Sequence, residues 1–114
     1  MLKTNLTHVI SEKDHSDLLT SNENVMICCG RMGPMCIPVY EVMEELEGEY
    51  KNIKFADMEF DSPDAKIIRN LPECRSFQGL PFVVYYKNGQ VVKATSSIQS
   101  RDQITSILDE QFSK

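Results

Sequence analysis

Residues 25–50 read VMICCGRMGPMCIPVYEVMEELEGEY, and the pattern changes within them indicate a strand, a break and a helix. Residues 25–29 form an unbroken apolar run that is too short for a helix, which is typical of a strand buried on both faces. Gly and Pro residues interrupt the chain over residues 30–34 and end that strand. From about residue 35 to residue 50, apolar residues recur with the spacing of one buried helix face, and acidic residues fill the rest.

The sequence on either side of this stretch continues the alternation of strands and helices. Further strands are predicted at residues 6–10, 53–61, 81–87 and 91–95, and further helices at residues 11–19, 62–71 and 101–112. Asn88-Gly89 between the last two strands predicts a type I′ hairpin turn, because both turn positions need positive φ. The order β-α-β-α-β-α-β-β-α therefore predicts an α/β fold with a central mixed sheet and helices on both faces.

Composition and charge exclude several classes of protein and leave redox chemistry open. The 114 residues suit one domain, residues 1–114, with a core of its own. A net charge of -5 disfavours nucleic-acid binding, which needs a basic face. No apolar run is long enough to cross a membrane and residues 1–7 show no secretory signal, so we expect a reducing, cytoplasmic location. In such a compartment, four cysteines are more typical of reactive, metal-binding or buried thiols than of structural disulfides.

Three strings within this order of elements resemble thioredoxins. Gly33-Pro34-Met35-Cys36 opens the long helix, Gly79-Leu80-Pro81 precedes a strand, and Lys87-Asn88-Gly89 joins the last two strands. The resemblance extends over residues 7–112 and implies the thioredoxin fold, with a cis peptide before Pro81 beside the active site. It also implies thiol–disulfide exchange with protein thiols and disulfides and a reductase as a further partner. It calls for no cofactor.

The motif that carries redox chemistry in thioredoxins, Trp-Cys-Gly-Pro-Cys, is altered in this chain. The sequence contains no Trp. When the long helices are aligned, Cys36 falls at the second, resolving cysteine of the motif and Gly33 falls at the first, nucleophilic one. Ile27 falls near the buried acid that thioredoxins use for proton transfer. The resemblance therefore implies the thioredoxin fold for this chain, but it does not imply the complete mechanism of thioredoxins.

Cys29 and Cys36 lie on either side of the break and form the candidate catalytic pair. Six residues separate them, including two glycines that allow a sharp bend, and we predict a disulfide between them under mild oxidation. Cys36 is the expected nucleophile because the free N–H groups of a helix N-terminus favour a thiolate, and Arg31 would add positive charge. The reverse assignment of roles is also open. The alternative is that both cysteines only pack in the core.

The remaining cysteines and the histidines receive simpler interpretations. Cys28 points to the opposite strand face from Cys29 and is expected in the core. Cys74 is either an accessory redox thiol or an idle loop cysteine. No metal site is predicted, because the cysteines lack the C-x2-C spacing of zinc sites. His8 is interpreted as a surface residue of a strand and His15 as a solvated residue of a helix.

A substrate-binding surface is predicted at five residues of the two motif loops: Gly33, Pro34, Met35, Leu80 and Pro81. Flexible methionines on an exposed tip suit adaptable binding. The favoured function is a thioredoxin-like thiol–disulfide oxidoreductase with a displaced C-x6-C pair. The alternative is a thioredoxin-fold module that binds partner chains without turnover, which the missing Trp, the missing buried acid and the shifted first cysteine favour.

Overall fold

The computed structural model describes residues 2–76 and 78–112, and the order of its elements agrees with the predicted one. The strands are β1 (Thr7–Val9), β2 (Asn24–Gly30), β3 (Lys54–Glu59), β4 (Phe82–Lys87) and β5 (Gln90–Thr95). The helices are α1 (Glu12–Ser21), α2 (Ile37–Glu47), α3 (Lys66–Arg69) and α4 (Arg101–Phe112), with short 3₁₀ turns at Pro63–Ala65 and Pro72–Ser76.

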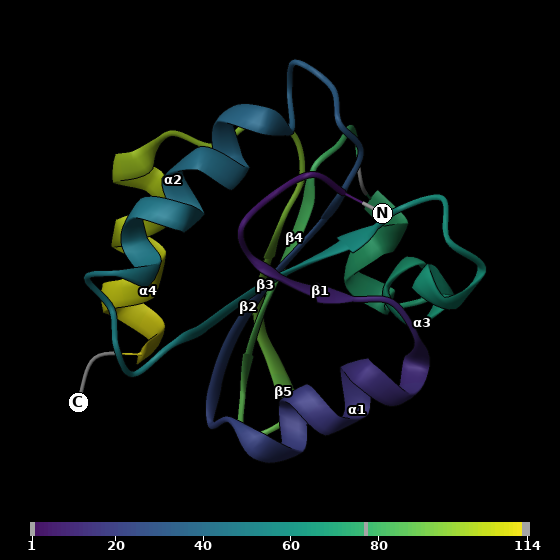
Figure 1. Cartoon of the computed structure of the whole chain (residues 1–114), viewed down its shortest axis with the longest axis horizontal. Helices are drawn as coiled ribbons and strands as arrows, with labels where there is room; N and C mark the ends of the chain where they lie inside the picture. Colours follow the sequence, from purple (N-terminus) through teal and green to yellow (C-terminus); the bar gives the residue numbers. More distant parts are fainter. Residues whose placement is uncertain (1, 77, 113–114) are drawn as a thin grey trace.

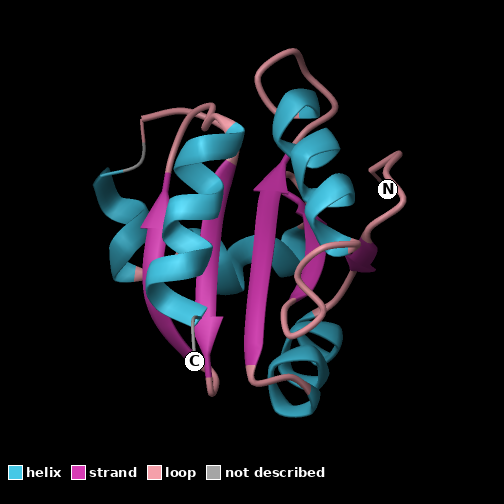
Figure 2. Cartoon of the chain, turned by 90° about the vertical axis from the view of Figure 1, so that its left-hand side faces the viewer, coloured by secondary structure: helices cyan, strands magenta, loops and turns pink. Residues whose placement is uncertain are grey.

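The strands form one mixed sheet in the spatial order β1-β3-β2-β4-β5. The pairs β1–β3 and β2–β3 are parallel, and β2–β4 and β4–β5 are antiparallel. Figure 1 shows the sheet edge-on, with α2 and α4 on one side and α1 and α3 on the other. Figure 2 looks onto the side that α2 and α4 cover. The predicted mixed sheet with helices on both faces is confirmed.

β2 lies in the centre of the sheet and is buried along its whole length. Because successive side chains of a strand point to opposite faces, its apolar run fills two cores at once. Met26 and Cys28 belong to the core under α2 and α4, whereas Ile27 and Cys29 belong to the core on the side of α1 and α3. This explains why the strand reads as a continuous apolar run rather than as an alternation.

Local chemistry sets the ends of the elements around the site. The Ser11 side chain accepts a hydrogen bond from the backbone N–H of Asp14 at 3.0 Å and caps α1 as predicted. The regular part of α2 begins at Ile37, two residues later than predicted, because the residues before it form a turn closed by hydrogen bonds to the Gly33 carbonyl. Asn88 and Gly89 have φ of 53° and 79°, as the type I′ turn requires.

Candidate active site

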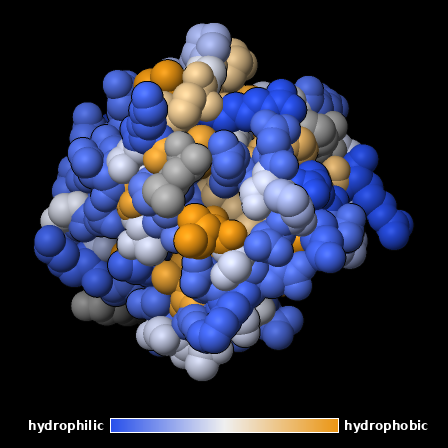
Figure 3. Space-filling model, turned by 45° about the vertical axis from the view of Figure 1, so that its right-hand side comes forward, coloured by the Kyte–Doolittle hydropathy of each residue, from blue (hydrophilic) through white to orange (hydrophobic). Residues whose placement is uncertain are grey.

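The two motif loops meet at one end of the sheet and line a groove. The groove has a volume of about 370 Å³ and is bordered by Arg31, Gly33, Pro34, Met35, Cys36, Phe60, Gly79 and Leu80. The Leu80–Pro81 peptide is cis, as the resemblance implies. Met32 and Met35 are 42% and 46% exposed. Figure 3 shows hydrophobic residues gathered at the top of the molecule, where Figure 1 places the β2–α2 loop. Four of the five predicted substrate-binding residues thus line one surface, with Pro81 directly behind it.

Cys36 lies on the wall of this groove, at the start of α2. The Gly33 carbonyl accepts hydrogen bonds from the N–H groups of Cys36 and Ile37 at 3.1 and 3.0 Å, so the first helical turn begins at Gly33. The backbone N–H of Arg31 donates a hydrogen bond to Cys36 Sγ at 3.4 Å. Only 3% of Cys36 is exposed, so a reagent reaches its sulfur through the groove and not from open surface.

The Arg31 side chain does not supply the free positive charge that the sequence suggests. Its guanidinium binds both carboxylate oxygens of Asp61 at 2.7 and 2.8 Å and stacks over the Phe60 ring, 5.7 Å from its centroid. This ion pair lowers the pKa of the Asp61 carboxyl below its usual range. The hydrogen bond that Arg31 donates to the Cys36 sulfur comes from its backbone N–H, and the guanidinium is paired with Asp61.

Gly33, at the place where the resemblance puts a nucleophilic cysteine, leaves room beside Cys36. A Cβ atom built at Gly33 would have no heavy atom within 4 Å. Gly30 lies in the opposite situation, since its Cβ would lie 2.8 Å from Tyr40 Oη and 2.9 Å from Cys36 Sγ. The Cys36 sulfur thus rests directly on the backbone of Gly30, whereas the space around a Cβ at Gly33 is open.

Cys29 and Cys74 are placed together on the other side of the sheet. All four cysteines are free and buried, and Cys29 shares its core with Cys74 rather than with Cys36. Burial raises the pKa of Cys29 to about 12, partly offset by the charge of Arg69, and burial also raises the pKa of Cys74. The structure does not bring Cys29 next to Cys36, so their predicted disulfide stays a prediction.

Cys28 shares the core of Cys36, together with Tyr40. It is fully buried, as the sequence predicts, and desolvation raises its pKa well above the usual range. Cys28 is therefore the cysteine that shares a core with Cys36, whereas the sequence spacing had paired Cys36 with Cys29.

A buried acid that the sequence analysis missed lies beside Cys28. Asp57 on β3 is 1% exposed and accepts hydrogen bonds from Thr4 Oγ1 and, at 2.7 Å, from His8 Nδ1. Burial raises the pKa of the Asp57 carboxyl. The available signal was an aspartate in the middle of a predicted strand, FADMEF, at a position that the strand alternation assigns to a core face. His8 is thus half-buried and hydrogen-bonded rather than a plain surface residue.

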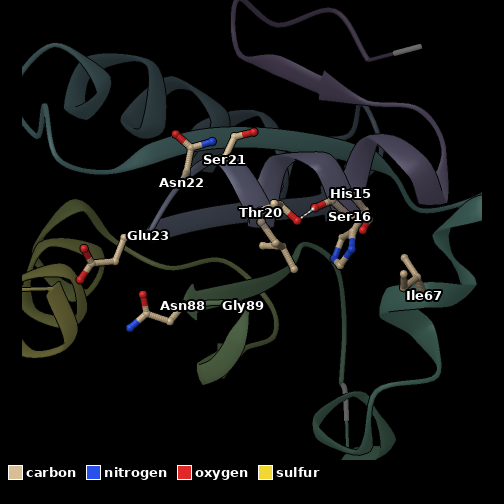
Figure 4. A pocket seen from close by; sticks show the side chains of 10 residues that line it. His15, Ser16, Thr20, Ser21, Asn22, Glu23, Ile67, Asn88 and Gly89 are labelled. Carbon is tan, nitrogen blue, oxygen red and sulfur yellow. Dashed lines mark hydrogen bonds between the residues drawn. The ribbon is translucent and has the colours of Figure 1, made fainter.

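The interpretation of His15 as a solvated residue is wrong. Its side chain is buried, and its Nε2 lies 3.0 Å from the hydroxyl of Tyr86. Figure 4 shows His15 between Thr20 and Ile67 in a cavity of about 630 Å³ that α1 and the β4–β5 turn border. Burial lowers the pKa of the imidazole. This cavity borders the opposite end of β2 from the groove, so His15 is remote from Cys36.

Within residues 2–76 and 78–112, no group of three or more His, Cys, Asp or Glu side chains is placed to hold a metal ion. In the same part of the chain, no helix is long and apolar enough to span a membrane.

Solved structures with the same arrangement are thioredoxins. The chain superimposes on thioredoxin f2 of Chlamydomonas reinhardtii with a TM-score of 0.79 and 12% identity, covering 96% of this chain and 99% of that one. It superimposes on the thioredoxin of Plasmodium falciparum with a TM-score of 0.77 and 18% identity, covering 93% and 99%. For mitochondrial thioredoxin 3 of Saccharomyces cerevisiae the TM-score is 0.75 at 18% identity, covering 92% and 94%.

The protein has the thioredoxin fold. The sequence itself matches no family model and no curated protein. The fold assignment therefore stands on the structural superpositions, on the mixed sheet and on the cis peptide before Pro81.

Proposed function

We propose that the protein is a thioredoxin-like thiol–disulfide oxidoreductase in which Cys36 is the reacting thiol. The observation that carries this proposal is the position of Cys36 on the wall of the groove beside the cis Leu80–Pro81 peptide. Cys28 and Cys29 are fully buried, and Cys74, which is 8% exposed, does not line the groove. Burial raises the pKa of each of these three thiols. A thiol must become a thiolate and be reachable to exchange, and Cys36 is the thiol with a path to a partner.

The open space at Gly33 gives the partner's sulfur a place to react. The Cys36 thiolate attacks one sulfur of a partner disulfide and forms a mixed disulfide, and the partner's second sulfur leaves as a thiolate. The backbone N–H of Arg31 is placed to hydrogen-bond the sulfur while it carries charge. The chemistry thus needs only the groove, one N–H donor and room beside Cys36.

The substrates are expected to be cysteines within extended protein segments. Pro34, Met35 and Leu80 present an apolar surface on both sides of Cys36, and methionine side chains adapt to varied partners. By the resemblance to thioredoxins, a reductase returns the protein to its thiol form, and the compartment is reducing and cytoplasmic. In this scheme Cys29, from the C-x6-C spacing, is one candidate for the second thiol, and Cys74 is a candidate accessory thiol.

A second function, binding of partner chains without turnover, is favoured by one observation. Gly33 stands where the resemblance calls for the nucleophile, while Met32 and Met35 beside it remain exposed. A surface of this kind binds an extended segment whether or not a sulfur reacts. The two functions differ in whether Cys36 becomes bonded to the partner.

The test measures reduction of a synthetic peptide that contains one disulfide, by the reduced protein, as release of peptide thiols. Wild type is expected to react, and Cys36→Ser is expected to lose at least about 100-fold in rate. Binding of the same peptide is measured in parallel by fluorescence anisotropy. A wild-type protein that binds the peptide but leaves its disulfide intact would support the binding module and overturn the oxidoreductase.

A further inference from the structure

A row of three polar residues crosses the sheet directly behind the groove. In the strand register, His8 on β1 pairs with Asp57 on β3, and Asp57 pairs with Cys28 on β2. Register neighbours on adjacent strands point to the same face and lie about 4.8 Å apart. Asp57 is 1% exposed, and its two carboxylate oxygens accept hydrogen bonds from Thr4 and His8. This row is not needed for the first exchange step at Cys36.

Cys36 lies over the same face as this row. Cys28 and Gly30 are two residues apart on β2, so their side-chain positions are neighbours on one face, about 6.6 Å apart along the strand. A Cβ atom at Gly30 would lie 2.9 Å from Cys36 Sγ, so the Cys36 sulfur occupies the position next to Cys28. Cys29 lies between them in sequence but points into the opposite core. A disulfide needs the two Cβ atoms about 3.5–4.5 Å apart, so the first turn of α2 must bring Cys36 within this distance of Cys28 when the bond forms.

We propose that Cys28 is the thiol that resolves the mixed disulfide at Cys36, and that Asp57 and His8 carry its proton to solvent. This inference rests on the proposed function. Asp57 takes the proton of Cys28, and the Cys28 thiolate attacks Cys36 Sγ. A Cys28–Cys36 bond forms, the bond between Cys36 and the partner breaks, and the partner's sulfur leaves with the electron pair as a thiolate. The partner disulfide gains two electrons over both steps, and the protein dithiol loses two.

The surroundings of Asp57 suit such a proton path. His8 Nδ1 is 2.7 Å from Asp57 Oδ1, and both residues line a cavity of about 280 Å³ through which His8 meets water. The titratable groups that face Asp57 are His8 on β1, Cys28 on β2, and Tyr40 and Glu44 on α2. Burial raises the pKa of both Asp57 and Cys28, which brings the acid closer to neutrality and leaves the thiol in need of a base.

The first experiment uses one equivalent of the aromatic disulfide 5,5′-dithiobis(2-nitrobenzoate) per reduced protein. Wild type is expected to release both aryl thiolates and to retain none by intact mass, with a Cys28–Cys36 disulfide in the peptide map. Cys28→Ala is expected to stop at the mixed disulfide on Cys36, releasing one aryl thiolate and retaining the other. Cys29→Ala, altered at the adjacent residue of the opposite face, is expected to proceed as wild type.

The outcomes separate this inference from the proposed function. If wild type and Cys36→Ser react with the reagent alike, the proposed function fails. If Cys36 forms a mixed disulfide that wild type does not resolve, or that Cys28→Ala resolves, Cys28 is not the resolving thiol. A Cys29–Cys36 bond in the wild-type map, with a block in Cys29→Ala, would establish the pairing that the sequence spacing predicts. The map is read on wild-type protein, so it decides the matter even if a variant does not fold.

A second experiment tests the proton path through the rate of the resolving step against pH. Asp57→Asn is expected to slow release of the second aryl thiolate at least about tenfold near pH 7 and to leave the first release unchanged, as for loss of a general base. His8→Gln is expected to slow the same step by a smaller factor. The pH dependence of the wild-type step should flatten in Asp57→Asn. An unchanged profile in that variant would remove Asp57 from the path.

Discussion

The two faces of the sheet contain the same chemical groups in different settings. On the face under α2 and α4, Cys28 and Cys36 share a core with a groove on one side and a buried acid on the other. On the face of α1 and α3, Cys29 and Cys74 share a core, and neither of them lines the groove. Each face therefore has two thiols, and the groove and the buried acid Asp57 lie with Cys28 and Cys36.

The contrast shows that two residues adjacent in the sequence can have different chemical surroundings. Cys28 and Cys29 are adjacent along the chain, yet the alternation of strand side chains places them in different cores. A spacing rule such as C-x6-C counts residues along the chain and does not register this alternation. If the contrast is sound, changes on the groove face should alter exchange, and changes on the other face should alter stability alone.

The largest expected effect comes from placing a thiol at Gly33. The position is open, and it is one helical turn before Cys36, so side chains at the two positions lie side by side. In a Cys28→Ala background, Gly33→Cys should therefore resolve mixed disulfides within the groove and raise turnover of a peptide disulfide about 100-fold, as expected when an intermolecular step becomes intramolecular. The measurement is peptide reduction coupled to a small dithiol reductant.

The control for this gain is Gly48→Cys, which adds an exposed thiol at the end of α2, away from the groove. In the same background it should leave turnover at the level of Cys28→Ala alone. An equal gain in both variants would mean that any extra thiol accelerates the assay. No gain at Gly33 would mean that partner disulfides do not enter the groove, and the contrast between the two faces would lose its functional meaning.

The next effect concerns the glycine on which Cys36 rests. In Gly30→Ala the new Cβ would approach Tyr40 Oη and Cys36 Sγ within 2.8 and 2.9 Å, so buried groups must shift. We expect a loss of about 2 kcal/mol in the free energy of unfolding, as for overpacking a core. Gly33→Ala, with open space around its Cβ, should lose nothing or gain up to about 1 kcal/mol. Urea denaturation followed by circular dichroism measures both, and equal stabilities would contradict the packing described here.

A smaller effect is expected in the reactivity of the two thiols that the sequence paired. Cys36 borders the groove, whereas Cys29 is fully buried and burial raises its pKa to about 12. During brief iodoacetamide treatment at pH 7, Cys36 should be alkylated at least about tenfold faster than Cys29. Peptide mapping by mass spectrometry gives both rates in wild type, and Cys36→Ser and Cys29→Ser verify the assignment. Faster alkylation of Cys29 would make it the nucleophile and Cys36 the resolving thiol.

The sequence predicted the fold well because its strongest patterns are local. The apolar run of residues 25–29, the Asn88-Gly89 turn and the Leu80-Pro81 string each fix a feature that neighbouring residues determine. The resemblance also located the groove, since both loops that line it carry motif strings. These features need no knowledge of which strands are adjacent in space.

The arrangement of the thiols and the acid could not be predicted in the same way. The neighbourhood of Asp57 depends on β3 lying between β1 and β2, which brings residues 49 and 29 positions away in sequence into one row. His15 is buried because Tyr86, 71 residues later, offers its hydroxyl. In each case a polar side chain is buried by a partner from a distant strand, and hydrophobic periodicity does not record such partners.

The smallest expected effect tests the face that has no groove, through His15. Burial lowers the pKa of its imidazole, with Glu12 acting weakly in the opposite direction. The folded protein therefore resists protonation of His15, while the unfolded chain takes up the proton near pH 6.5. Stability contributed by the neutral imidazole is complete above about pH 6.5 and declines as the pH falls below it, by at most about 1.4 kcal/mol per pH unit. His15→Gln, which can still hydrogen-bond Tyr86, should lack this slope.

Urea denaturation of both proteins at pH 7.5 and 5.5 measures this pH dependence of stability. The contributions of the carboxylates, which both proteins have in common, cancel in the difference between them. The exchange rate at Cys36 should be the same in the two proteins, since His15 lies at the opposite end of β2. A parallel loss of exchange in His15→Gln would show that the two faces are coupled.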